Sequence, residues 1–140
     1  MQQRLTIVGL GVNDLATAND FYENIFGWTK LPSSNDNITF MQLNGILLSL
    51  YPKEKLAEDA GVSSVGSGFK AFTLAYNTHS KEEVDRLFAQ LAVKGVKIVK
   101  APEEVFWGGY SGYIADPDEN LWEIAYNPYL PLETNGDVKS

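Results

Sequence analysis

The chain has 140 residues, 44% of them hydrophobic and 21% charged, the size and mixture of one globular domain. The formal net charge of −7 disfavours nucleic acid as a partner, and no apolar run approaches the roughly 20 residues of a membrane span. The absence of cysteine excludes disulfides and thiolate chemistry. Because the N-terminus carries no signal-like apolar region, we expect a cytoplasmic protein.

The first half of the sequence predicts a strand, a helix and three further strands. Residues 5–12 are apolar and β-branched, as in a buried strand. Asn13 and Asp14 then offer a helix N-cap, and apolar residues recur with helical spacing up to a stop at Gly27. Asn44-Gly45 is the strongest short hairpin signal. The further strands are expected at residues 28–31, 38–43 and 46–51.

The second half repeats this order of elements. A connector at residues 53–68 begins with a possible helical turn and becomes rich in glycine and serine. A strand is expected at residues 69–76, and Ser80 with Glu83 forms the capping box of a helix that ends at Gly95. Three more strands are expected at residues 96–99, 109–115 and 121–126. The shared order predicts an internal repeat.

These elements predict one α+β domain over residues 1–128. Its two βαβββ modules are expected at residues 5–52 and 69–128, on either side of the connector. Residues 129–140 are polar and contain proline and glycine, so we expect a loose C-terminal tail.

Two stretches of the sequence resemble the vicinal-oxygen-chelate superfamily of glyoxalases, bleomycin resistance proteins and dioxygenases. One runs from Val12-Asn13-Asp14-Leu15 through residues 21–28, and the other is the closing hairpin at residues 113–124, similar to the family pattern DPDGN-x-x-E. The resemblance spans residues 12–124. It implies two modules whose mixed sheets curl around a cavity, with the helices outside, and it implies a homodimer.

Members of this superfamily usually hold a divalent metal with residues from the first and last strands of each half. By the resemblance, the first-strand positions fall on Ile7 and Phe69, which cannot coordinate a metal. The last-strand positions fall on Ser49, a weak neutral ligand, and on Glu123. The single histidine, His79, lies in a loop. Since one carboxylate binds a metal weakly, we expect no metal and no cofactor, with a divalent metal as the alternative.

Alternation along the strands predicts which side chains face the cavity. The hairpin should pair Phe40 with Ser49 and Gln42 with Leu47, and two aromatic residues flanking a Gly-Gly pair are expected at the rim. The aromatic residues of this face could equally be ordinary core. The predicted ligand-binding residues are Phe40, Gln42, Ser49, Phe69, Trp107, Tyr110, Tyr113 and Glu123.

Glu123 is the candidate catalytic residue, and two interpretations stay open for it. It either accepts a hydrogen bond from a tyrosine hydroxyl such as that of Tyr113, or it is a carboxylate with a raised pKa that acts as a base or binds a cationic ligand. Asp116 and Asp118 are interpreted as turn formers next to Pro117.

The sequence therefore predicts a glyoxalase-like or bleomycin-resistance-like protein that binds a small, partly aromatic organic molecule without a metal. One alternative is a metal-dependent enzyme with ligands at other positions, either a lyase of the lactoylglutathione lyase type or a dioxygenase. A lyase is favoured between these two, because iron sites of dioxygenases need two histidines and the chain has one. The other alternative is a structural or interaction module with a filled cup.

Overall fold

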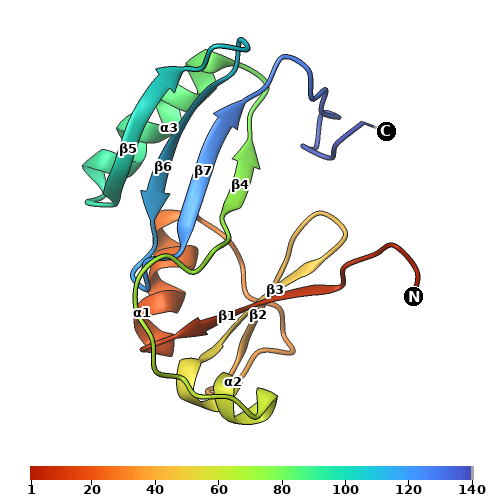
Figure 1. Cartoon of the computed structure of the whole chain (residues 1–140), viewed down its shortest axis with the longest axis vertical. Helices are drawn as coiled ribbons and strands as arrows, with labels where there is room; N and C mark the ends of the chain where they lie inside the picture. The colour runs from red at the N-terminus through yellow and green to blue at the C-terminus, as the bar shows by residue number, and fades with distance from the viewer. Residues whose placement is uncertain (140) are drawn as a thin grey trace. The chain divides into compact units, whose positions relative to one another are not determined.

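In the computed structural model, which describes residues 1–139, the chain forms two units, each built on one β-sheet (Figure 1). The first unit comprises Met1–Gly68 and the second begins at Phe69. Among these residues, no helix has the length and apolar character needed to span a membrane.

The sheet of the first unit has three strands in the order β1-β3-β2. β1 (Ile7–Val12) runs parallel to β3 (Leu47–Pro52), and β2 (Thr39–Gln42) runs antiparallel to β3. Gly45, with φ of 75°, turns the chain between β2 and β3, a conformation that favours glycine. The expected hairpin is therefore present.

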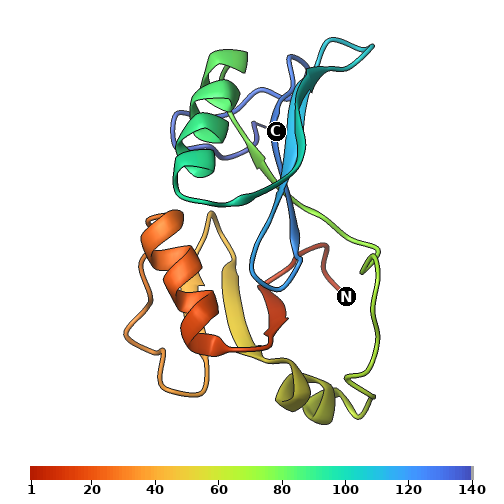
Figure 2. The ribbon, with the colours of Figure 1, turned by 90° about the vertical axis from the view of Figure 1, so that its left-hand side faces the viewer.

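One helical segment covers one face of this sheet (Figure 2). α1 (Leu15–Asp20) begins after Asp14, whose side chain accepts a hydrogen bond of 3.0 Å from the Thr17 amide, as the predicted N-cap requires. The segment continues as η1 (Phe21–Ile25), a π-helical turn. Its buried side chains pack on this face of the sheet. The buried residues of this face are Leu10, Val12, Thr39, Met41, Leu48 and Leu50.

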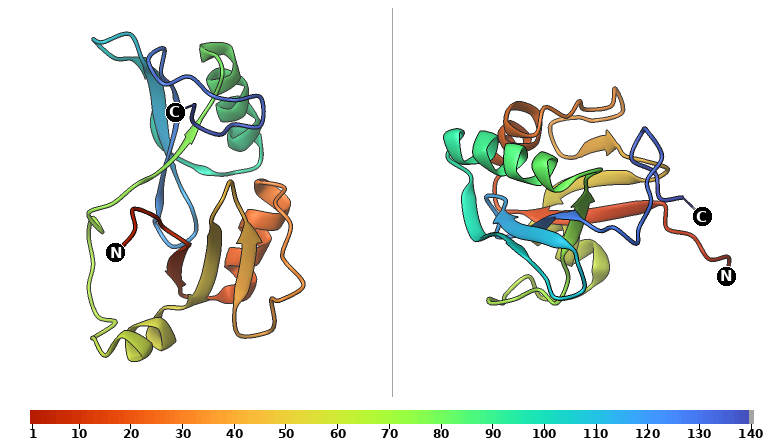
Figure 3. Two further views of the ribbon diagram at one scale, coloured as in Figure 1. Left: turned by 90° about the vertical axis from the view of Figure 1, so that its right-hand side faces the viewer. Right: turned by 90° about the horizontal axis from the view of Figure 1, so that it is seen from above.

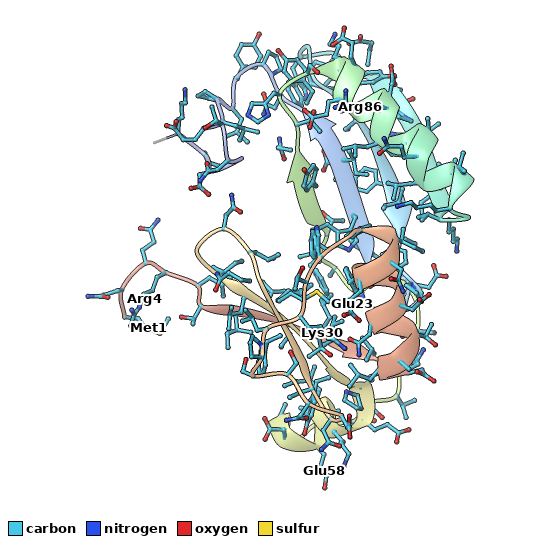
Figure 4. The ribbon with its side chains drawn as sticks, turned by 180° about the vertical axis from the view of Figure 1, so that it is seen from behind. Met1, Arg4, Glu23, Lys30, Glu58 and Arg86 are labelled. Carbon is cyan, nitrogen blue, oxygen red and sulfur yellow. The ribbon has the colours of Figure 1, made fainter. Side chains whose placement is uncertain are left out.

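The strand expected at residues 28–31 is reduced to a single antiparallel bridge between Lys30 and Met41. Pro32 has no amide hydrogen with which to continue the ladder. Lys30 also forms an ion pair with the helical segment, since its Nζ lies 3.5 Å from Glu23 Oε2 (Figure 4). The expected helical turn after β3 is present as α2 (Lys53–Ala60).

The sheet of the second unit has four strands in the order β4-β7-β6-β5. β4 runs parallel to β7, and β6 is antiparallel to both β7 and β5. Each unit thus places its first strand beside and parallel to its last, as an internal repeat predicts. The strands are β4 (Leu74–Asn77), β5 (Lys97–Glu104), β6 (Tyr110–Ala115) and β7 (Leu121–Tyr126).

β5 is an edge strand of this sheet and is irregular. Its register against β6 shifts between Ile98 and Lys100 and again between Lys100 and Glu103. Pro102 lies within the second shift. The strand is longer than the one expected at residues 96–99, because an edge position tolerates a proline that a central strand would not.

α3 (Lys81–Val93) lies along one face of the second sheet (Figure 2). Ser80 Oγ accepts a hydrogen bond of 3.2 Å from the Glu83 amide, and the Glu83 carboxylate accepts one of 3.0 Å from the His79 amide. The predicted capping box thus starts the helix. The Glu83 carboxylate bonds to the amide of His79, the residue before the N-cap, and not to the amide of Ser80 itself. The buried side chains of α3 are Val84, Phe88 and Leu91.

Gly112 allows α3 to pack closely on β6. A Cβ atom at this position would lie 2.6 Å from Phe88 Cζ and 2.6 Å from the Lys100 carbonyl oxygen. Gly112 lies opposite Ile124 of β7, so these two residues mark the face of the sheet that α3 covers.

β4 is shorter than the strand expected at residues 69–76. Ala71 has φ of 61°, a left-handed conformation that interrupts an extended strand. The preceding Lys70 is held by the β6–β7 turn, where its Nζ donates hydrogen bonds of 2.9 Å to the Asp118 carbonyl and to Asn120 Oδ1.

That turn is organised by Asp116. Its Oδ1 accepts hydrogen bonds from the amides of Asp118 (2.9 Å) and Asn120 (2.8 Å), and its Oδ2 accepts one from the Asn120 side chain (2.8 Å). Asp116 is only 3% exposed. Its carboxylate is occupied by the turn, which agrees with its interpretation as a turn former.

A loose tail was expected at residues 129–140, of which Ser140 lies outside the described residues. Residues 131–139 include a small hairpin beside the start of α3 (Figure 3). Leu132 and Val138 form an antiparallel bridge, and the Glu133 amide donates a hydrogen bond of 2.7 Å to the Asp137 carbonyl. His79 Nε2 lies 2.9 Å from the Glu133 carbonyl oxygen. Because a carbonyl only accepts, this nitrogen carries the proton.

Candidate functional site

Tyr113 and Glu123 lie side by side on the face of the second sheet that is turned away from α3. They are directly opposite in the β6–β7 ladder, and Tyr113 Oη donates a hydrogen bond of 2.9 Å to Glu123 Oε2. Alternation places them opposite to Gly112 and Ile124, which face the helix. The tyrosine hydrogen bond that the first interpretation of Glu123 expects is present, and it uses one of the two carboxylate oxygens.

The pair combines a neutral phenol with a carboxylate. Burial raises the pKa of Tyr113, and the hydrogen bond to Glu123 and its negative charge raise that pKa further. The phenol therefore stays protonated at neutral pH and keeps its hydrogen bond. Glu123 Oε1 has no hydrogen-bond partner within the described residues, so it can accept a hydrogen bond from a ligand.

Small side chains flank this pair. Ala75 of β4 lies opposite Glu123 on one side, and Ser111 and Ala125 form the next rung of the β6–β7 ladder on the same face. The rung on the other side of the pair joins Ala115 and Leu121, so the larger Leu121 also lies on this face. Glu123 is half-buried, which leaves part of its side chain accessible to a ligand.

On the other side of the pair, Lys100 of β5 lies opposite Tyr113. Lys100 Nζ lies 2.7 Å from Glu103 Oε1, with both side chains more than half exposed. Such an exposed ion pair contributes about 0–1 kcal/mol to stability. Three neighbouring strands thus carry a carboxylate, a phenol and an ammonium group in one row.

Phe40 and Ser49 lie on the face of the first sheet that is turned away from α1. Ser49 is directly opposite Phe40 on β2 and Gly9 on β1, which confirms the predicted register of the hairpin. Ser49 is 7% exposed, and Phe40 is half-buried. The structure therefore brings these two predicted ligand-binding residues together.

Gln42, on the same strand as Phe40, has its side-chain donor occupied by the hairpin. Its Nε2 donates hydrogen bonds to the carbonyls of Leu43 (2.8 Å) and Ile46 (3.1 Å). Gln42, which was predicted to bind a ligand, therefore stabilises the hairpin through these two bonds.

Ile7 and Phe69 occupy the positions that the resemblance assigned to metal ligands. Ile7 lies on β1 opposite Leu47 and is 42% exposed, whereas Phe69 is 69% exposed and lies outside β4. Neither side chain has an atom that binds a metal. Among residues 1–139, no group of three or more histidine, cysteine, aspartate or glutamate side chains is arranged to hold a metal ion.

Trp107 lies in the turn between β5 and β6 and packs on its own turn. A Cβ atom at Gly109 would lie 2.2 Å from the Trp107 ring, so the indole covers this glycine. The ring centroid of Trp107 is also 6.5 Å from that of Tyr129. The neighbours of Trp107 are therefore its own turn and Tyr129, just after β7.

Tyr110 lies on the α3 side of β6, opposite to Tyr113. Its Oη donates a hydrogen bond of 2.6 Å to Asp85 Oδ1 of α3. This hydrogen bond is the main cause that raises the pKa of Tyr110 to about 12. Tyr110 was grouped with Tyr113 as a predicted ligand-binding residue, and its contact with Asp85 was not predicted. The spacing could have shown the difference, because residues three apart on a strand lie on opposite faces.

Comparison with known proteins agrees with this architecture. Residues 4–124 match the family model described as the Glyoxalase/Bleomycin resistance protein/Dioxygenase superfamily, and the chain belongs to this superfamily. The crystal structure of a glyoxalase-related enzyme from Fulvimarina pelagi is 35% identical, with a TM-score of 0.88 and 99% of each chain covered.

Two further relatives are more distant. The uncharacterized protein YraH of Bacillus subtilis (strain 168) is 29% identical over 126 residues, which cover 86% of this chain and 96% of YraH. The crystal structure of lactoylglutathione lyase from Agrobacterium tumefaciens is 20% identical, with a TM-score of 0.71 and coverage of 91% of this chain and 96% of the lyase. The likeness to the lyase is one of fold.

Proposed function

We propose that this chain binds a small, partly aromatic organic molecule without a metal ion, with Glu123 as its polar anchor. The observation that carries the proposal is the state of the Glu123 carboxylate. One oxygen is held by Tyr113 at 2.9 Å, and the other has no partner in the part of the chain that the structure describes. Membership of the superfamily supports a small-molecule ligand.

The two residues have separate tasks in this proposal. Tyr113 fixes the orientation of the carboxylate, and Oε1 of Glu123 accepts a hydrogen bond from an N–H or O–H group of the ligand. Glu123 is also the residue that would take a proton if the bound molecule reacts, because a carboxylate at hydrogen-bond distance is a suitable general base.

The proposal is metal-free because of the chemistry of the side chains at the superfamily's metal positions. Ile7 and Phe69 offer no donor atom, and Ser49 offers a neutral hydroxyl. We expect the purified protein to contain zinc, nickel, manganese and iron only in substoichiometric amounts. One equivalent of any of these metals per chain would overturn this part of the proposal.

Ligand binding is tested by NMR titration with benzamidine, a flat cation that carries N–H donors. Saturable shifts are expected at the amides of Tyr113 and Glu123, and Glu123→Gln should weaken binding about tenfold, the loss of one hydrogen bond to a charged group. Glu82→Gln, at an exposed position of α3, is the control for the change in net charge. Equal affinity of both variants would contradict the role of Glu123.

We also propose a homodimer, the assembly that the resemblance implies. Several large apolar side chains remain exposed in the single chain, and a dimer would bury those that lie in its interface. Sedimentation velocity should give twice the mass of one chain, and a single species of one-chain mass would contradict the dimer. These exposed side chains include Leu5, Phe69, Phe72 and Phe106.

A further inference from the structure

Ser49 is nearly buried in the first sheet, yet its hydroxyl is unpaired. It is 7% exposed, and its Oγ has no hydrogen-bond partner among residues 1–139. In that part of the chain, every side-chain nitrogen or oxygen that is sealed from solvent does have a partner, so Ser49 Oγ must remain accessible. Since no group of the described chain bonds to it, this hydroxyl is left for water or for a ligand group that takes the place of that water.

Gly9 leaves open space directly beside this hydroxyl. A Cβ atom at Gly9 would lie 3.3 Å from Ser49 Oγ, and no other heavy atom of the described chain, apart from the neighbours in sequence, comes within 4 Å. Gly9 has no positive φ, so its backbone conformation does not demand glycine. A strand glycine of this kind permits close approach of a ligand to the backbone.

Gly11, two residues further along the same face, shows the contrast. A Cβ atom at Gly11 would lie 3.2 Å from Lys53 Cα at the start of α2, so the protein itself covers this glycine. Gly9 is therefore the open position of the pair, and Phe40 lies on the other side of Ser49 in the ladder.

We propose that Gly9, Ser49 and Phe40, the Gly9 site, bind a flat aromatic ring through a neutral carbonyl or hydroxyl group on its edge. The ring lies on the Gly9 backbone with Phe40 nearby, and its polar group exchanges a hydrogen bond with Ser49 Oγ. This inference rests on the proposed function and deepens it by naming a ligand class and a second contact region, on the first unit.

A neutral polar group fits this site better than a charged one. The hydroxyl of Ser49 both donates and accepts hydrogen bonds but cannot balance a charge. A charged group placed there would lose hydration without an ion-pair partner. The side chains of the three strands on this face are uncharged: Ile7, Gly9, Gly11, Phe40, Gln42, Leu47, Ser49 and Tyr51.

The test is an NMR titration of the full chain with benzamide, and with toluene as the ring without a polar edge. Benzamide should shift the amide signals of Gly9 and Ser49 saturably and bind at least about tenfold more tightly than toluene, the effect of one hydrogen bond. Gly9→Ala should weaken benzamide binding at least about tenfold, because its Cβ occupies the position of the ring. Ser49→Ala should lower the affinity for benzamide to that for toluene.

Matched controls separate the site from general effects of substitution. Gly66→Ala adds a methyl group at a glycine with ordinary φ and open surroundings, and Ser33→Ala removes an exposed hydroxyl. Both should bind benzamide as the unaltered chain does. Should Gly9→Ala fail to give a folded spectrum, the comparison of Ser49→Ala with Ser33→Ala decides the matter.

The outcomes also separate this site from the Tyr113–Glu123 pair. If benzamidine shifts Tyr113 and Glu123 while benzamide leaves Gly9 and Ser49 unchanged, the Gly9 site is wrong and the proposed function stands. Equal affinities for benzamide and toluene likewise overturn the role of Ser49. If neither probe gives saturable shifts in either unit, both proposals fail.

Discussion

The hydrogen bond between Tyr113 and Glu123 joins two neighbouring strands through their side chains. A hydrogen bond to a charged acceptor contributes about 1.5–3 kcal/mol when it is protected from water. Both side chains are half-buried, so a value at the lower end is appropriate here. The bond also occupies Glu123 Oε2, so Oε1 is the oxygen that can accept a hydrogen bond from a ligand.

Tyr110 predicts a specific pH dependence of stability. Its hydrogen bond to Asp85 raises the pKa to about 12 in the folded chain, whereas an unfolded tyrosine titrates at about 10. Its contribution to stability is therefore complete below about pH 10 and is lost as the pH rises towards 12. In urea unfolding between pH 9 and 12, Tyr110→Phe should lose stability less steeply than the unaltered chain. An identical slope for both would contradict this, and Tyr129→Phe is the control.

Glu119 predicts a stabilising substitution. It has φ of 62°, a left-handed conformation that costs a side-chain residue about 1 kcal/mol relative to glycine, and the DPDGN pattern of the superfamily has glycine here. Its ion pair with Lys97, 2.9 Å long and exposed on both sides, offsets little of this cost. Glu119→Gly should raise the free energy of unfolding by up to about 1 kcal/mol, measured by urea denaturation.

Lys97→Ala is the control for Glu119, because it removes the ion pair and leaves the backbone unchanged. It should alter stability by less than about 0.5 kcal/mol. A lower stability of Glu119→Gly than of Lys97→Ala would show that the backbone conformation is not the source of strain.

At the scale of elements, local signals predicted what local interactions determine. β7 (Leu121–Tyr126) coincides with its expected range, and the Asn44-Gly45 hairpin has its expected register. The segment at residues 28–31 failed as a strand because Pro32 ends the ladder, and the segment before β4 failed because Ala71 turns left-handed and Lys70 bonds a distant turn. The bond from Lys70 to Asp118 joins residues 48 positions apart, so the sequence around Lys70 does not predict it.

The candidate site was predicted in the same uneven way. Alternation placed Tyr113 and Glu123 on one face, and it paired Phe40 with Ser49, because strand geometry fixes both. It did not reveal that Trp107 folds onto its own turn. The side-chain bond of Gln42 to the hairpin carbonyls and the open space at Gly9 also depend on three-dimensional packing.

The packing of α3 on the second sheet predicts a severe effect of Gly112→Ala. The added Cβ would lie 2.6 Å from both Phe88 Cζ and the Lys100 carbonyl oxygen, and the carbonyl cannot move without disturbing β5. We expect a loss of about 1–3 kcal/mol in the free energy of unfolding, typical of overpacking, measured by urea denaturation. Gly66→Ala, in open surroundings, should change stability by less than about 0.5 kcal/mol. A tolerated Gly112→Ala would mean that α3 can shift.

At the scale of the whole molecule, each unit has its own core. Leu50 and Ile114 are both 0% exposed, the first in the sheet of one unit and the second in the sheet of the other. Leu50→Ala and Ile114→Ala should each cost about 2–5 kcal/mol. Hydrogen exchange should show Leu50→Ala accelerating exchange mainly in residues 1–68, and Ile114→Ala mainly beyond them. Equal acceleration in both units would show that they unfold as one.

The irregular edge of the second sheet has a consequence for the behaviour of concentrated protein. A strand from a second molecule that tried to pair with β5 would meet its two register shifts. It would also meet Pro102, which has no amide hydrogen to donate. Lysine and glutamate side chains along the same strand would lose their hydration on contact. Edges of this kind resist the strand-by-strand growth of fibrils, so crowding should not turn this flank of the molecule into a template for amyloid.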